Sequence, residues 1–122
     1  MKAYTDIKQS KKLSEILPPE SADMWYWEWP TAPKYNNYEH PMFHKGDDIV
    51  NVPCWSLAAL LSVTRNYCIR FELTLRANKK YNLFAMTDNF VYRGFNEYPD
   101  GINNPIDACY EMILKLHELK ML

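Results

Sequence analysis

Apolar positions near the end of the chain recur at helical spacing. Residues 104–107 read NPID, where Asn104 suits a helix cap, Pro105 the first helical position and Asp107 the positive helix end. An apolar stripe with a period of about 100° per residue follows. It consists of Ile106, Cys109, Met112, Ile113, Leu116 and Leu119. The pattern predicts an amphipathic helix packed on the core.

The pattern changes to alternation between residues 69 and 76, which is typical of a half-buried antiparallel strand. The apolar positions are Ile69, Phe71, Leu73 and Leu75, and the polar ones are Arg70, Glu72, Thr74 and Arg76. Turn residues at 77–80 and 88–89 separate this strand from strands expected at 81–87 and 90–95. The segment therefore predicts a meander at 68–95 with one apolar face.

Two further helices are expected earlier in the chain. Residues 5–17 have apolar positions at roughly helical spacing, with Thr5 as the cap and Pro18-Pro19 as the stop. Residues 53–63 are apolar on nearly all sides, and Pro53 suits the first helical turn. We therefore expect an α+β fold: a three- or four-stranded antiparallel sheet with about three helices packed on one face, the last one across the meander.

Residues 24–29 read MWYWEW and predict a strand that ends at Pro30. Side chains of a strand alternate between its faces, so Trp25, Trp27 and Trp29 share one face. Such a row either fills a core or forms a stacking surface for a ligand or a partner protein. The sequence leaves both interpretations open.

The stretch from 30 to 53 is the least regular part of the chain. It contains Pro30, Pro33, Pro41 and Pro53, with turn residues at 36–37 and 46–48. A connection of this length is uncommon within a small domain and is often functional. With 122 residues in all, we expect a single globular domain over 1–122, with an irregular loop at about 30–53.

Composition narrows the class of protein. Apolar residues make up 48% of the chain, which argues against disorder. The net charge of −1 gives no overall attraction to nucleic acid or anionic membranes. Its distribution is uneven: residues 65–93 carry six basic and two acidic side chains, and residues 13–63 carry two basic and seven acidic ones. Attraction between these segments is the simplest interpretation.

The three cysteines, Cys54, Cys68 and Cys109, are widely spaced and have apolar neighbours. An odd number without a CxxC pair indicates free, buried thiols, which fit the reducing cytoplasm. The N-terminus has no apolar signal segment, and no apolar run is long enough to span a bilayer. We therefore expect a cytoplasmic protein without a membrane partner.

A basic sheet face is the second candidate surface. Arg70 and Arg76 point away from the predicted core, and Arg93 lies on the third strand of the meander. Combined with exposed tryptophans, these arginines would resemble a surface that binds single-stranded nucleic acid. The alternative is a solvated outer face, since strand exteriors are commonly charged.

The sequence supports no catalytic, cofactor or metal assignment. His40 and His44 are four residues apart, but Pro41 places them in a loop, where this spacing has no meaning for metal binding. Cys54 at a helix N-terminus, with one of these histidines as base, would make a cysteine-dependent enzyme. Its apolar neighbours favour an inert thiol instead. We find no phosphate-binding glycine loop.

Three stretches carry a resemblance to known sequences. They are SEILP (14–18) with ADM (22–24), PCWSLAALL (53–61), and NPIDACYEM (104–112) with KLHEL (115–119). Together they resemble a family of small uncharacterised proteins from gut bacteria and their phages. That family has no assigned activity, so the resemblance transfers no functional residue. It implies a phage or mobile-element context, a cytoplasmic location, and a binding or accessory role.

These observations predict a module that acts by binding, without enzymatic activity. We expect the partner to be another protein or a second copy of the chain, contacted through Trp25, Trp27, Trp29 and the loop at 30–53. The alternative is a single-stranded nucleic acid bound by these tryptophans together with Arg70, Arg76 and Arg93. The cysteine-dependent enzyme is a third hypothesis. The sequence identifies neither the ligand nor the oligomeric state.

Overall fold

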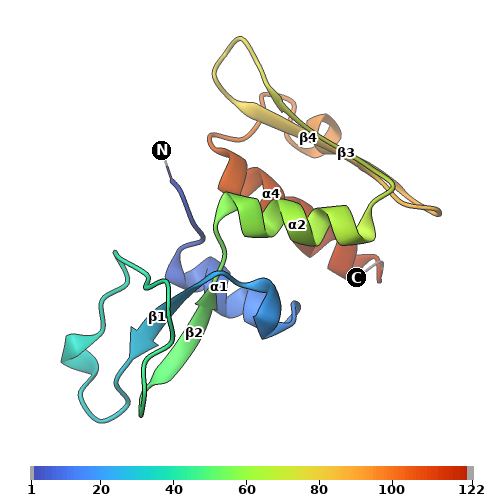
Figure 1. Cartoon of the computed structure of the whole chain (residues 1–122). Coiled ribbons are helices and arrows are strands. Elements are labelled where there is room, and N and C mark those ends of the chain that lie inside the picture. The colour runs from blue at the N-terminus through green and yellow to red at the C-terminus, as the bar shows by residue number, and fades with distance from the viewer. Residues whose placement is uncertain (1, 121–122) are drawn as a thin grey trace.

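The computed structural model describes residues 2–120, except that only the backbone is described at Phe95. Its helices are α1 (Ile7–Ser14), α2 (Leu57–Tyr67), α3 (Gly94–Glu97) and α4 (Pro105–Glu118). Its strands are β1 (Met24–Glu28), β2 (Val50–Cys54), β3 (Arg70–Leu75), β4 (Tyr81–Met86) and β5 (Val91–Arg93). Antiparallel pairing gives two sheets, β1-β2 and β3-β4-β5. The fold is α+β, as predicted, and α2 and α4 lie between the two sheets (Figure 1).

The three-stranded sheet is the predicted meander. On its inner face Leu73 lies opposite Leu83, and Ala85 lies between Phe71 and Tyr92. Leu83, Ala85 and Tyr92 are buried in the main core with apolar residues of α2 and α4. The predicted apolar face is shorter than expected, because Ile69 and Leu75 are 65% and 61% exposed. Only the central residues of β3 pack against this core.

Helix α4 begins as predicted. Asn104 caps it by accepting a hydrogen bond from the Asp107 N–H at 2.8 Å, and Pro105 occupies the first turn. Five of the six predicted stripe residues are fully buried: Ile106, Cys109, Met112, Ile113 and Leu116. The prediction was wrong for Leu119, which is 40% exposed because the helix ends at Glu118.

The other two helices begin later than predicted. Asp6, not Thr5, caps α1: it accepts the Gln9 N–H, while the Gln9 side chain accepts the Asp6 N–H. In α2 the cap is Ser56, whose hydroxyl accepts the Ala59 N–H at 3.2 Å. Thr5 is buried instead, with its hydroxyl 2.8 Å from that of Ser10.

The prediction that Pro53 starts a helix was wrong, because Pro53 lies in β2. Trp25 faces Pro53 in the register of β1 and β2, yet Trp25 exchanges both of its main-chain hydrogen bonds with Met42 on the other side of β1. Trp25 and Pro53 therefore form a non-hydrogen-bonded pair, in which the missing N–H of proline costs the ladder nothing.

Strand β1 was predicted correctly but belongs to the smaller sheet, so the meander has three strands. The smaller sheet has a second, smaller apolar cluster, formed by Met24, Tyr26, Val52 and Cys54. Ile7 of α1 packs against this cluster. Leu13 of the same helix lies in the main core. Helix α1 thus contributes to both clusters. Within residues 2–120, no helix combines the length and apolar character that a membrane crossing requires.

Candidate functional site

The tryptophan row lies outside both apolar clusters. Met24 and Tyr26 face the small cluster and are buried, whereas Trp25 and Trp27 alternate with them on the opposite face of β1. Trp29 follows the strand, and all three indoles are half-buried. The row therefore belongs to neither apolar cluster, although each of its indoles is largely covered.

The irregular loop is shorter than the predicted 30–53, because residues 50–53 belong to β2. The loop between β1 and β2 folds back along β1 and covers part of the row. Met42 exchanges two main-chain hydrogen bonds with Trp25, at 2.8 and 2.7 Å. The Trp29 N–H donates to Asn36 Oδ1 at 2.8 Å, and Trp27 Nε1 donates to the His44 carbonyl at 3.0 Å. This loop, which the sequence describes only as irregular, forms a wall beside the strand.

A hydrogen bond between Glu28 and Tyr38 holds the loop against β1. Tyr38 donates a hydrogen bond to the Glu28 carboxylate, which also lies 3.1 Å from Lys11 Nζ on α1. The bond from Tyr38, with a smaller contribution from Lys11, holds the pKa of Glu28 below its ordinary value. Asn36 Nδ2 donates to the Tyr38 hydroxyl at 3.1 Å. The carboxylate therefore joins the loop, β1 and α1 at one point.

An apolar cleft of about 220 Å³ opens between strand and loop. Its lining residues are Trp27, Trp29, Asn37, His40 and Met42. The rings of Trp27 and Trp29 meet edge to face with centroids 6.1 Å apart, and Trp27 meets His44 in the same way at 5.2 Å. The volume is below the roughly 300–1,000 Å³ of pockets for drug-sized ligands, so it suits one or two side chains.

Other aromatic side chains of the same loop are exposed. Phe43, next to Met42, is 79% exposed, and Tyr35 is 62% exposed. Lys45 Nζ lies 5.8 Å from the ring centroid of Trp25, within the range of a cation–π contact. Trp25 Nε1 is buried without a hydrogen-bond partner among the described residues. The loop thus presents large aromatic side chains to solvent.

The structure separates the predicted arginines from the tryptophans. Arg70 and Arg93 lie on the outer face of the three-stranded sheet, with α2 and α4 between this sheet and β1 (Figure 1). Their guanidinium carbons lie 5.4 and 5.8 Å from the ring centroid of Phe84. Arg76 instead bonds to the Pro99 carbonyl. The six predicted residues therefore do not form one surface.

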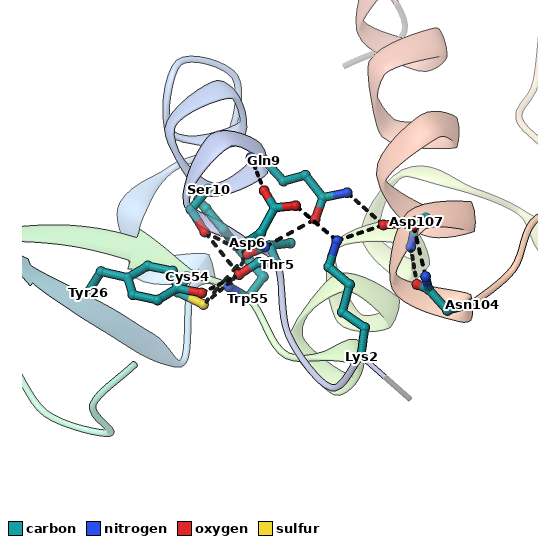
Figure 2. A network of polar contacts seen from close by, with 10 residues as sticks. All are labelled: Lys2, Thr5, Asp6, Gln9, Ser10, Tyr26, Cys54, Trp55, Asn104 and Asp107. Atoms are coloured by element: carbon teal, nitrogen blue, oxygen red, sulfur yellow. Dashed lines mark hydrogen bonds and ion pairs between the residues drawn. The ribbon is translucent and has the colours of Figure 1, made fainter. Parts of the chain in front are cut away.

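A polar cavity of about 430 Å³ lies on another side of the molecule, near the start of α4. Figure 2 shows the network at its edge, where Lys2 Nζ and Gln9 Nε2 donate to Asp107 at 2.8 and 2.7 Å. Lys2 also lies 3.1 Å from Asp6. Each of these side chains already has a partner within the network. The cluster consequently ties the N-terminal segment to α4.

The same view contains the buried thiol of Cys54. It contacts the Thr5 hydroxyl at 3.6 Å and is fully buried, not placed at a helix N-terminus (Figure 2). Burial raises the pKa of the Cys54 thiol, and burial also raises that of Cys109 to about 12. Both are protonated near neutral pH, unlike a thiolate nucleophile. Among the described residues, no three His, Cys, Asp or Glu side chains are grouped to hold a metal ion.

Sequence reasoning identified Trp27 and Trp29 but missed Asn37 and Met42 as the facing wall of the cleft. One signal was present: Met42 and Phe43 form an adjacent apolar pair in an otherwise polar stretch at 36–48. Comparisons with protein-family models, curated protein sequences and solved structures found no match to this chain.

Proposed function

We propose that this chain is a non-enzymatic module that binds a short extended segment of another protein. The observation that carries the proposal is the apolar cleft lined by Trp27 and Trp29, which belong to neither apolar cluster. A site of this size holds one apolar, aromatic or prolyl side chain of a partner.

The main chain of β1 supports this mode of binding. Trp25 directs its N–H and C=O to the outer edge of β1, and alternation places those of Trp27 on the same edge. The loop is attached at Trp25 and at Trp29, on either side of this position. Because the loop occupies the edge at both of these points, a bound segment would reach the site by placing one side chain in the cleft beside Trp27.

Two predictions about context accompany the proposal. The free thiols Cys54, Cys68 and Cys109 fit the reducing cytoplasm, where we expect the module to act. The phage or mobile-element setting implied by the sequence resemblance stays a prediction.

A second candidate function is binding of single-stranded nucleic acid by the other sheet. The observation that favours it is Phe84, half-buried on the outer face and flanked by the guanidinium groups of Arg70 and Arg93. In many nucleic-acid-binding proteins, bases stack on an exposed aromatic ring, and neighbouring arginines attract the phosphates. This candidate does not use the tryptophans.

Two variants separate the candidates. Peptides that bind the chain are first selected from random decapeptides displayed on phage. The enriched peptides and a dT10 oligonucleotide are then titrated separately into the protein, and binding is followed by the Trp fluorescence of the protein and the fluorescence anisotropy of the labelled ligand. We expect Trp29→Ala to weaken peptide binding by about tenfold or more, and the matched Phe84→Ala variant to leave it unchanged. Trp55 is fully buried in the main core and supplies a constant background signal.

Each outcome has a definite meaning. Peptides enriched equally by wild type and Trp29→Ala would contradict the cleft proposal. Oligonucleotide binding that falls with added salt and is lost in Phe84→Ala would favour the second candidate. Absence of oligonucleotide binding at low salt would exclude it.

A further inference from the structure

Strand β3 forms an open edge of the three-stranded sheet. Within residues 2–120, no strand or isolated bridge pairs with its outer side. The Arg76 N–H bonds to the Lys80 carbonyl at 2.8 Å, so even-numbered residues of this strand direct their main-chain groups toward β4. Phe71, Leu73 and Leu75 therefore direct theirs outward. Such a row is a template for another strand.

The usual protection of an edge strand is weak here. Proteins cover such edges or interrupt them with charged side chains, proline or a bulge. The sequence of β3, RFELTL, contains no lysine or proline, and its two charged residues, Arg70 and Glu72, have opposite signs. Apolar side chains at both ends of β3 are exposed, Ile69 by 65% and Leu75 by 61%, and Tyr67 nearby is 41% exposed. The opposite edge strand, β5, has only three residues.

We propose that two copies of this chain associate through β3, antiparallel, about a two-fold axis at Phe71. The two sheets then form one continuous six-stranded sheet. Both copies must keep their apolar sides on the same face, so the axis passes through a residue and not between two. Phe71 lies opposite the partner's Phe71, so the main-chain pairing covers residues 70–72 of each copy. Ile69 lies at the end of this pairing, next to the partner's Leu73, because its own N–H already donates to the Met86 carbonyl of β4 at 2.7 Å.

Charge selects this register over its neighbours. With the axis at Phe71, Arg70 faces the partner's Glu72 and Glu72 faces the partner's Arg70, two favourable cross-strand pairs. An axis at Glu72 would place two Glu72 carboxylates opposite each other. An axis at Leu73 would place Arg70 opposite the partner's Arg76. Both neighbouring registers therefore oppose like charges.

The contact is short, so we expect a weak dimer. Sedimentation velocity of the wild-type chain between 10 and 500 µM is expected to show a monomer–dimer equilibrium with a Kd of roughly 1–100 µM. A strict monomer at 500 µM would overturn the proposal.

A charge exchange tests the register directly. Arg70→Glu alone places two Glu–Glu pairs across the interface, and Glu72→Arg alone places two Arg–Arg pairs, so each variant is expected to dimerise at least about tenfold more weakly. Mixing the two variants in equal amounts restores two opposite-charge pairs. The mixture is therefore expected to form heterodimers with wild-type affinity, which also shows that both variants are folded.

A matched control addresses the other edge of the sheet. Val91→Lys on β5 changes a residue that is 38% exposed and is expected to leave the dimer unchanged, whereas Ile69→Lys weakens it. If both single charge variants dimerise as well as wild type, or if mixing them restores nothing, pairing through β3 about Phe71 is wrong. Dimer loss in Val91→Lys alone would place the contact on β5 and would also overturn the proposal.

Discussion

The Asp107 carboxylate holds three parts of the chain together. It accepts hydrogen bonds from Lys2, Gln9 and Asn104 at 2.7–2.8 Å. Burial alone would raise the pKa of Asp107, but these three donors outweigh it and hold the pKa below its ordinary value. A group with a lowered folded pKa stabilises the fold above its unfolded pKa, about 4, and loses this effect as the pH falls through the folded pKa.

We therefore expect Asp107→Asn to lower the free energy of unfolding by about 1 kcal/mol at pH 7, a value reduced by the partial exposure of the carboxylate. The difference from wild type should stay constant down to about pH 4 and shrink at lower pH, as wild type also becomes neutral. Urea unfolding at pH 7, 5 and 3 measures it. Asp88→Asn, at an exposed turn, is the control, and a difference independent of pH would contradict the assigned role.

At the scale of elements, Ser56 sets the start of α2. Its hydroxyl accepts the Ala59 N–H and also bonds to the Asp23 carboxylate, which accepts the Ser56 N–H at 3.0 Å. We expect Ser56→Ala to lower the free energy of unfolding by about 1–2 kcal/mol, because both the cap and the contact with Asp23 are lost. Ser62→Ala, at an exposed position of the same helix, should change it by less than about 0.5 kcal/mol. Equal effects in urea unfolding would show that Ser56 is not the cap.

Elements with a clear period were predictable, because the period shows which side chains share a face. The stripe of α4 and the alternation of β3 are examples. Pro53 was misleading because the same fixed φ suits the first turn of a helix and a strand position that needs no N–H. Thr5 and Asp6 are both good caps. Asp6 is selected by its reciprocal bonds with Gln9, and Thr5 is buried beside Tyr26, which donates to the Thr5 carbonyl at 2.8 Å.

The candidate site was predictable only in part, for a related reason. Alternation placed Trp25, Trp27 and Trp29 on one face, but which face is buried depends on α1, whose Ile7 packs beneath β1. The opposite wall depends on the pairing of Met42 with Trp25 across an irregular loop, and no local pattern encodes that pairing. The network at Asp107 joins residues about one hundred positions apart and had no sequence signal.

At the scale of the whole molecule, the two apolar clusters are joined at several points. The Thr5 N–H donates to the Trp55 carbonyl at 2.9 Å, and the Trp55 N–H donates to the Thr5 hydroxyl at 3.1 Å. Trp55 belongs to the main core, and its neighbour Cys54 belongs to the small cluster. Leu13 carries α1 into the main core, while Ile7 packs on the small one. These links predict that both clusters unfold together.

Leu13→Ala tests this cooperativity. Leu13 is fully buried, so the truncation should lower the free energy of unfolding by about 2–4 kcal/mol. Three of the four tryptophans lie on or next to β1, so fluorescence reports mainly on the smaller sheet, while far-UV circular dichroism reports mainly on α2 and α4. Because α1 contributes to both clusters, the two urea transitions should coincide and shift equally in the variant. The exposed control Leu75→Ala should shift neither. Separate transitions would show that the two sheets unfold as independent units, in conflict with the single domain predicted from the sequence.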